Sequence, residues 1–129
     1  MTDTVKLSEY RPIYTTALTS PFELDNNFRS ALVLSDPMVK AGTYIVLCDH
    51  AVEFDNTTRS IEWKYEGVVN SITFSAKQKS PSDIVPRNYI FKFTLDVDSP
   101  VTISLEIRKK GNLDTAKVVA GSISVMRVL

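Results

Sequence analysis

The chain contains the segment Tyr89-Ile90-Phe91-Lys92-Phe93-Thr94-Leu95-Asp96-Val97, and after Asp98-Ser99-Pro100 it continues as Val101-Thr102-Ile103-Ser104-Leu105-Glu106-Ile107. Large apolar side chains occupy every second position of both segments, which is the period of two expected of strands with one face in a core. The short Asp/Ser/Pro link between the segments favours a β-hairpin. A third apolar segment, Val118 to Leu129, ends the sequence, so we expect the last strand to lie inside a sheet.

The middle of the chain continues this pattern. Thr43 to Cys48 is apolar enough to predict a buried strand, and residues 61–66 alternate between apolar and charged side chains. Alternation resumes from Val68 to Ala76, which predicts a hairpin about Glu66-Gly67. The pattern predicts an all-β chain, folded as a single antiparallel β-sandwich or jelly roll of about 8–9 strands over residues 1–129.

The first third of the chain is less regular. Pro12 interrupts a Thr- and Tyr-rich segment, so we expect residues 1–12 to form an extended N-terminal arm. Ser20-Pro21-Phe22-Glu23 has the residues of a helix start, which predicts at most one short helix near residues 21–28. Ala31 to Leu34 is a short strand candidate that ends at the turn-forming residues Ser35-Asp36-Pro37.

Composition narrows the possible functions. Lys plus Arg equals 15 and Asp plus Glu equals 15, and the longest run of like charge is Arg108-Lys109-Lys110, which we expect to cap a solvated hairpin. This balance argues against binding to nucleic acid, because affinity for phosphate needs many cations on one surface. One cysteine permits no intramolecular disulfide, and no signal peptide or apolar membrane span is evident. We therefore expect a protein made in a reducing cytoplasm, without a membrane partner.

Cys48-Asp49-His50 is the one place where residue types used in catalysis lie together. A Cys–His pair needs hydrogen-bond reach between the sulfur and the imidazole. Side chains two residues apart on a strand project in parallel, ~7 Å apart, and do not normally meet. We therefore expect Cys48 to be a buried small apolar residue and His50 to lie at a strand end, and we assign no catalytic residue.

Metal and sugar sites are also considered. One cysteine and one histidine are too few ligands for zinc. Calcium would need oxygen ligands, which the loop aspartates supply, although turns also favour aspartate. Those aspartates are Asp36, Asp55, Asp96, Asp98 and Asp114. Tyr44, Trp63 and Tyr65 would suit an aromatic platform for a sugar, but core packing is the preferred interpretation of these rings. We assign no metal or cofactor site.

Two stretches carry a family resemblance. Residues 101–112, followed by residues 121–129, resemble the final strands of small jelly-roll proteins of the tumour-necrosis-factor-like kind. Lys40-Ala41-Gly42-Thr43-Tyr44 resembles the segment that leads into a strand in small β-sandwich proteins of tailed-bacteriophage virions. The resemblance implies a non-enzymatic module, often trimeric, that decorates or cements a capsid or forms part of a tail or fibre.

Two functions follow as hypotheses. The first is a structural virion protein assembled in the host cytoplasm, a capsid decoration or cement subunit that forms a homo-oligomer, with a trimer favoured. Its expected contacts with other virion proteins are the arm around Val5 to Tyr14 and the long loop from Lys77 to Asn88. The second is a ligand-binding β-sandwich, either a carbohydrate- or receptor-binding tail module or a calcium-dependent C2-like domain. An enzyme that uses Cys48 and His50 is the weakest alternative.

Overall fold

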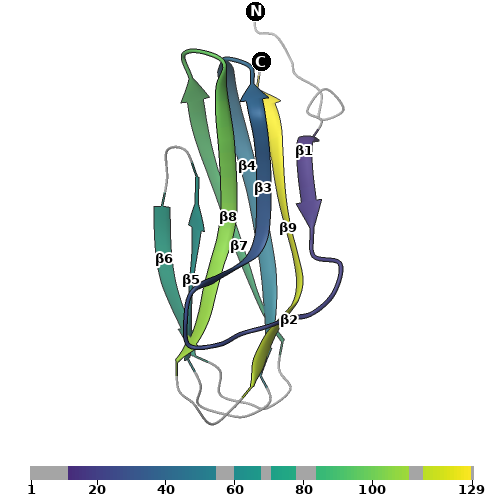
Figure 1. The fold of residues 1–129 in the computed structure, drawn as a ribbon, viewed down its shortest axis with the longest axis vertical. Coiled ribbons are helices and arrows are strands. Elements are labelled where there is room, and N and C mark those ends of the chain that lie inside the picture. Colours follow the sequence, from purple (N-terminus) through teal and green to yellow (C-terminus); the bar gives the residue numbers. More distant parts are fainter. Residues whose placement is uncertain (1–11, 55–59, 68–70, 78–83, 111–114, 129) are drawn as a thin grey trace, which may run out of the picture.

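The computed structural model describes residues 12–54, 60–67, 71–77, 84–110 and 115–128, which form nine β-strands and no helix (Figure 1). No helix in these ranges is long and apolar enough to cross a membrane. The strands are β1 (Pro12–Ala17), β2 (Phe22–Glu23), β3 (Arg29–Val39), β4 (Gly42–Phe54), β5 (Ser60–Glu66), β6 (Ser71–Lys77), β7 (Ile84–Leu95), β8 (Ser99–Lys110) and β9 (Ala116–Val128).

The strands form two antiparallel sheets. The five-stranded sheet has the order β1-β9-β4-β7, and β2 also pairs with β9. The four-stranded sheet has the order β3-β8-β5-β6. Figure 1 shows β3 and β8 in front of β4 and β7, so the sheets stack as the two layers of a sandwich. The predicted all-β sandwich is confirmed, and so is the interior position of the last strand, because β9 lies between β1 and β4.

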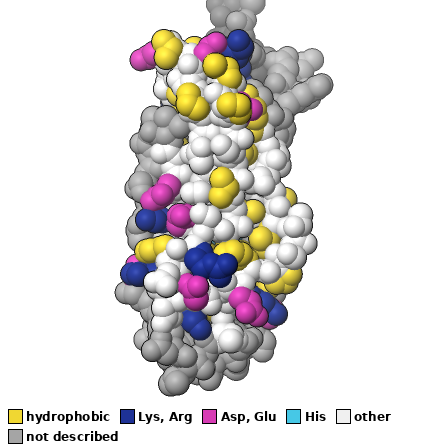
Figure 2. All heavy atoms as spheres, in the orientation of Figure 1, with side chains coloured by type: hydrophobic (Ala, Val, Ile, Leu, Met, Phe, Trp, Pro, Cys, Tyr) yellow, Lys and Arg dark blue, Asp and Glu magenta, His cyan; other side chains and the backbone are white. Residues whose placement is uncertain are grey.

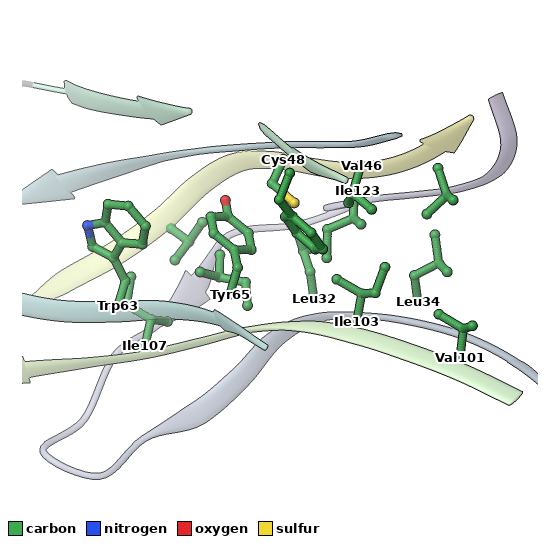
Figure 3. Packing of buried hydrophobic residues seen from close by; sticks show 14 of the residues in the cluster. Leu32, Leu34, Val46, Cys48, Trp63, Tyr65, Val101, Ile103, Ile107 and Ile123 are labelled. Carbon is green, nitrogen blue, oxygen red and sulfur yellow. The ribbon is translucent and has the colours of Figure 1, made fainter. Parts of the chain in front are cut away.

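The core lies between the two layers. Every second residue of β8 turns inward, and Ile103, Leu105 and Ile107 have no exposed surface. The facing sheet contributes Val46 from β4 and Ile123 from β9, which are equally buried. Figure 3 shows Ile103 and Ile107 on one side of the gap between the sheets and Val46 and Ile123 on the other. Burial of such side chains stabilises a sandwich by about 1.5–3 kcal/mol each relative to an exposed position.

The predicted hairpin between β7 and β8 is wrong. β7 pairs with β4, where Tyr89 lies opposite Cys48, whereas β8 pairs with β3 and β5. The link between the two strands therefore crosses from one sheet to the other. Both strands bury one face in the same core, so each shows the period of two whether or not it pairs with the other. Val97, at this crossing, is 68% exposed.

The second predicted hairpin is confirmed. β5 pairs with β6 from Ser60↔Lys77 to Glu66↔Ser71. The described part of the second strand is Ser71–Lys77, and residues 68–70 of the predicted strand lie outside the described ranges.

The expected short helix near residues 21–28 is not formed. Phe22 and Glu23 are extended and pair with Val118 and Lys117 of β9. The carboxylate of Asp25 accepts a hydrogen bond from the Asn27 backbone N–H at 2.8 Å, which closes a turn in place of a helical bond. Pairing with β9 provides partners for backbone groups of Phe22 and Glu23, so this segment does not need a helix to satisfy them.

The predictions for three other segments need correction. The strand expected at Ala31 to Leu34 runs from Arg29 to Val39, and the turn expected at Ser35-Asp36-Pro37 is instead an irregularity in its pairing with β8. The loop expected from Lys77 to Asn88 is shorter, because β7 already begins at Ile84. The predicted N-terminal arm lies outside the described residues, except that Pro12 begins β1.

Candidate interaction surfaces

Cys48 and His50 lie on β4 and point into the core. They are 3% and 2% exposed, and burial raises the pKa of the Cys48 thiol to about 12. A thiol with this pKa stays protonated at neutral pH and is a poor nucleophile. The burial of Cys48 was predicted correctly, but His50 lies well inside its strand and not at the end.

His50 links the two sheets. Its Nδ1 shares a hydrogen bond of 2.7 Å with the hydroxyl of Tyr65, which belongs to β5 of the opposite sheet. The His50 ring also packs edge-on against Trp63, with ring centroids 4.8 Å apart. Burial raises the pKa of the Tyr65 hydroxyl, so this hydroxyl is protonated and able to take part in the bond. This polar contact holds the layers together inside the core.

The three aromatic rings that were considered as a platform for a sugar do not lie on the surface. Tyr44, Trp63 and Tyr65 are at most 4% exposed and belong to the core, as the preferred interpretation of these residues predicted. Tyr44 stacks on Phe93 of the neighbouring strand at 5.3 Å and donates its hydroxyl hydrogen to the Lys40 carbonyl at 2.7 Å. These rings are not available to stack on a sugar.

Two of the loop aspartates, Asp36 and Asp98, accept hydrogen bonds from backbone N–H groups. Asp98 accepts hydrogen bonds from the Ala41 N–H at 2.8 Å and from the Lys40 ammonium at 3.3 Å, which lower the pKa of its carboxyl. Asp36 accepts the Met38 N–H at 2.8 Å. Asp55 and Asp114 lie outside the described ranges. No group of three or more His, Cys, Asp or Glu side chains that would hold a metal ion occurs in the part of the chain that the structure describes.

A groove of about 420 Å³ lies where the edge strands β1 and β3 approach each other across the sandwich. Its lining combines hydroxyl groups with two aliphatic side chains: Tyr14, Thr15, Thr16, Val33, Leu34 and Ser35. Burial raises the pKa of the Tyr14 hydroxyl, so this group is a hydrogen-bond donor at neutral pH. This groove was not predicted from the sequence, because it depends on which edges the topology brings together.

The outer face of the four-stranded sheet carries paired charges (Figure 2). Arg108 of β8 binds the carboxylate of Glu62 on β5 at 3.1 Å, and Lys64 binds Glu66 at 2.8 Å. Arg108 and Lys64 also lie over the ring of Phe28, at 4.5 Å and 4.7 Å from its centroid. Arg108 therefore does not cap a solvated hairpin as predicted. The described charges Arg108, Glu62, Lys64 and Glu66 of this face are thus paired within the subunit.

The outer face of the five-stranded sheet differs. Five apolar side chains of β4, β7 and β9 point outward on it, and we call them the apolar face: Ile45, Leu47, Ile90, Met126 and Val128. Ile90 is 65% exposed and lies directly opposite Leu47, and Ile45 lies directly opposite Met126. Among the described side chains of these central rows, the charged ones are Asp49 and Lys92. The signal in the sequence was the apolar run from Thr43 to Cys48, which we interpreted as a buried strand.

A smaller apolar cluster lies at one end of the sandwich, where Figure 2 shows hydrophobic side chains near the β3–β4 and β7–β8 links. Met38 and Val97 are 55% and 68% exposed there. Asp98 lies beside them, because its carboxylate accepts the hydrogen bond from the Ala41 N–H in the β3–β4 link.

Comparisons with known proteins show the fold and no family. No protein-family model and no curated protein sequence matches the chain significantly. A chain from the structure of infectious bursal disease virus, Gx strain, is similar with a TM-score of 0.62 at 11% identity, over 90% of this chain and 32% of the viral chain. This chain thus spans less than two thirds of that viral chain.

Two other solved structures are similar at the level of the sandwich. Eiger TNF from S. frugiperda has a TM-score of 0.50 at 9% identity, over 92% of this chain and 94% of that one. TmCBM61, in complex with β-1,4-galactotriose, has a TM-score of 0.42 at 14% identity, over 95% and 91% of the two chains, which is too low to support an argument. The chain therefore has a β-sandwich fold of the jelly-roll and TNF-like kind, as the sequence resemblance implied.

Proposed function

We propose that this chain is a structural virion protein, a decoration or cement subunit of a tailed-bacteriophage capsid that is assembled in the host cytoplasm. It acts by contact with copies of itself and with other virion proteins, and not as an enzyme. A homotrimer is the favoured form. The similarity to a chain of a virus structure supports the fold on which this proposal rests.

The observation that carries the proposal is the difference between the two outer faces. The four-stranded sheet pairs its charges within the subunit, through the Arg108–Glu62 and Lys64–Glu66 contacts. The five-stranded sheet instead presents the apolar face, where Ile90, on the edge strand β7, is 65% exposed. The central part of a protein interface is depleted of charge, whereas a free sheet face usually alternates toward polar residues. This pattern favours a subunit whose five-stranded sheet is covered in an assembly.

The surroundings of the reactive side chains support a non-enzymatic role. The Cys48 thiol and the His50 ring are buried, and burial raises the pKa of the thiol to about 12. His50 shares its Nδ1 hydrogen bond with Tyr65 across the core. These residues contribute to packing between the sheets, where a substrate would not reach them.

Light scattering and particle binding test the proposal together. We expect the full chain to have three times the mass of one subunit and to co-sediment with capsids of the phage that encodes it. Deletion of residues 1–11, which precede β1, is expected to leave a folded sandwich that binds particles less well. A monomeric chain that does not co-sediment with particles would remove the support for this function.

The groove between β1 and β3 favours a second candidate function, the binding of a sugar. Tyr14, Thr16 and Ser35 place hydroxyl groups along it, which suits the hydroxyl groups of a saccharide. A glycan array tests this idea, and Tyr14→Ala should abolish any signal that the groove produces. An array without signal would rule this candidate out in favour of the structural one.

A further inference from the structure

We infer that the apolar face of the five-stranded sheet is covered by a second copy of this chain. The inference rests on the proposed function, because it names the surface through which the subunits of the oligomer meet. Three features of the face favour a second copy as its partner.

The first reason is the charge pattern. Asp49 and Lys92 stand on opposite sides of the Leu47–Ile90 pair, because β4 and β7 are antiparallel and Asp49 lies opposite Asn88 while Lys92 lies opposite Ile45. Strand geometry places the two charged residues about 14 Å apart, beyond ion-pair reach within one copy. A face with one acid and one base on either side of an apolar pair can meet another copy of the chain without uniform like-charge repulsion. An anionic surface such as a phospholipid membrane or a nucleic acid would favour a face of uniform positive charge.

The second reason is the available area. β1, β9, β4 and β7 lie side by side, and β4 is 13 residues long. With strands ~4.8 Å apart and ~3.4 Å per residue, these four strands together cover about 700 Å². A stable protein interface buries roughly 800 Å² on each partner, so the area of the sheet is comparable to that of one such interface.

The third reason is the layout of polar groups around the apolar face. Thr43 and Thr94 form a hydroxyl pair at 3.0 Å where β4 begins, whereas the pair of Thr15 and Ser124, at 3.5 Å, lies beside Leu47. Glu53 and Lys117 form an ion pair further along the sheet. An apolar centre with a polar margin is the usual plan of an interface between protein subunits.

Site-specific labelling tests the inference in the full chain. We would compare Ile90→Cys with Thr102→Cys, a control at an exposed position of β8 on the outer face of the four-stranded sheet. Cys48 does not interfere, because it is buried and the pKa of its thiol is about 12. The maleimide labelling rate at position 90 should fall about tenfold between about 1 µM and about 100 µM chain, a range that brackets a micromolar dissociation constant. The rate at position 102 should stay constant.

A second variant uses light scattering. Ile90→Asp adds a charge at an exposed position, so the subunit should stay folded, with the fluorescence of buried Trp63 unchanged, but should lose the oligomer mass. Thr102→Asp, on the outer face of the four-stranded sheet, should keep that mass. Equal labelling rates at every concentration, or an Ile90→Asp chain with the parent's mass, would overturn the inference. Co-sedimentation of the parent chain with particles reports separately on the proposed function, so that function survives if only the labelling and mass results fail.

Discussion

The hydrogen bond between His50 and Tyr65 provides a quantitative test of how the sandwich is held together. Tyr65→Phe removes only the hydroxyl, and the ring keeps its packing against Trp63 at 5.7 Å and Tyr89 at 6.4 Å. Tyr65 and His50 are 1% and 2% exposed, so water does not replace the lost partner of Nδ1. Loss of one partner of a buried hydrogen bond costs about 1–3 kcal/mol.

The assay is urea unfolding followed by the fluorescence of Trp63. This is the single tryptophan of the chain, it is 4% exposed, and its ring contacts that of His50. We expect Tyr65→Phe to lower the unfolding free energy by about 2 kcal/mol and the melting temperature by roughly 7 °C. The slope of free energy against urea should not change, because the two chains expose the same surface on unfolding.

Two comparisons make this test specific. Tyr44→Phe removes a hydroxyl that donates to the Lys40 carbonyl in a partly buried position, so it should cost less, below about 1 kcal/mol. A double-mutant cycle of Tyr65→Phe with His50→Leu should give a coupling energy of about 1 kcal/mol or more. If Tyr65→Phe unfolds within about 0.5 kcal/mol of the parent, or if the coupling is near zero, the bond does not hold the sheets together.

Three further predictions concern other contacts. Gly121→Ala should lower the free energy of unfolding by about 1–3 kcal/mol, because an added Cβ would lie 3.0 Å from a leucine methyl and 3.2 Å from a backbone oxygen. Gly67→Ala is the control, because the atom nearest to its added Cβ is 3.4 Å away. Equal losses of unfolding free energy in urea for the two variants would contradict this prediction. Cys48 should react with a disulfide reagent at pH 8 about a thousandfold more slowly in the folded than in the urea-unfolded chain, because its pKa is raised to about 12; similar rates would show an accessible thiol. The lowered pKa of Asp98 implies stability that is present above the ordinary value of about 4 and is lost as the pH falls through the folded value. Asp98→Asn should therefore flatten the loss of stability between about pH 4 and pH 2, and an unchanged acid profile in urea would show that its bond to Ala41 contributes nothing.

The inward and outward faces of most strands could be predicted from the sequence. Phe91, Ile103 and Leu105 are buried as the alternation indicated. This succeeds because the period of two depends only on one face meeting a core, whichever strands lie beside it. The prediction of a short helix was wrong because it relied on local residues alone. The capping residues Ser20 to Glu23 favour a helix locally, but β9 offers Phe22 and Glu23 a partner that the local sequence does not reveal.

The candidate surfaces were harder to predict. The run from Thr43 to Cys48 has apolar residues at both alternations, which reads as a strand covered on both sides. The structure covers one side only within the subunit, and Ile45 and Leu47 remain partly exposed on the other. A run of this kind identifies a strand that is covered on both faces in some state of the protein, and that state need not be the isolated chain.

The misassigned β7–β8 pair shows why the apolar face depends on topology. In a hairpin, the two strands would lie side by side in the four-stranded sheet, and Ile90 would face outward among the charges of β5 and β8. A strand that crosses to the other sheet buries the same residues, so alternation and link length do not distinguish the two arrangements. The residue-by-residue pairing of Gly42–Glu53 with Ile84–Leu95 decides between them. It places Ile90 beside Leu47, and this pairing across two separate segments creates the face that we infer to be covered by a second copy.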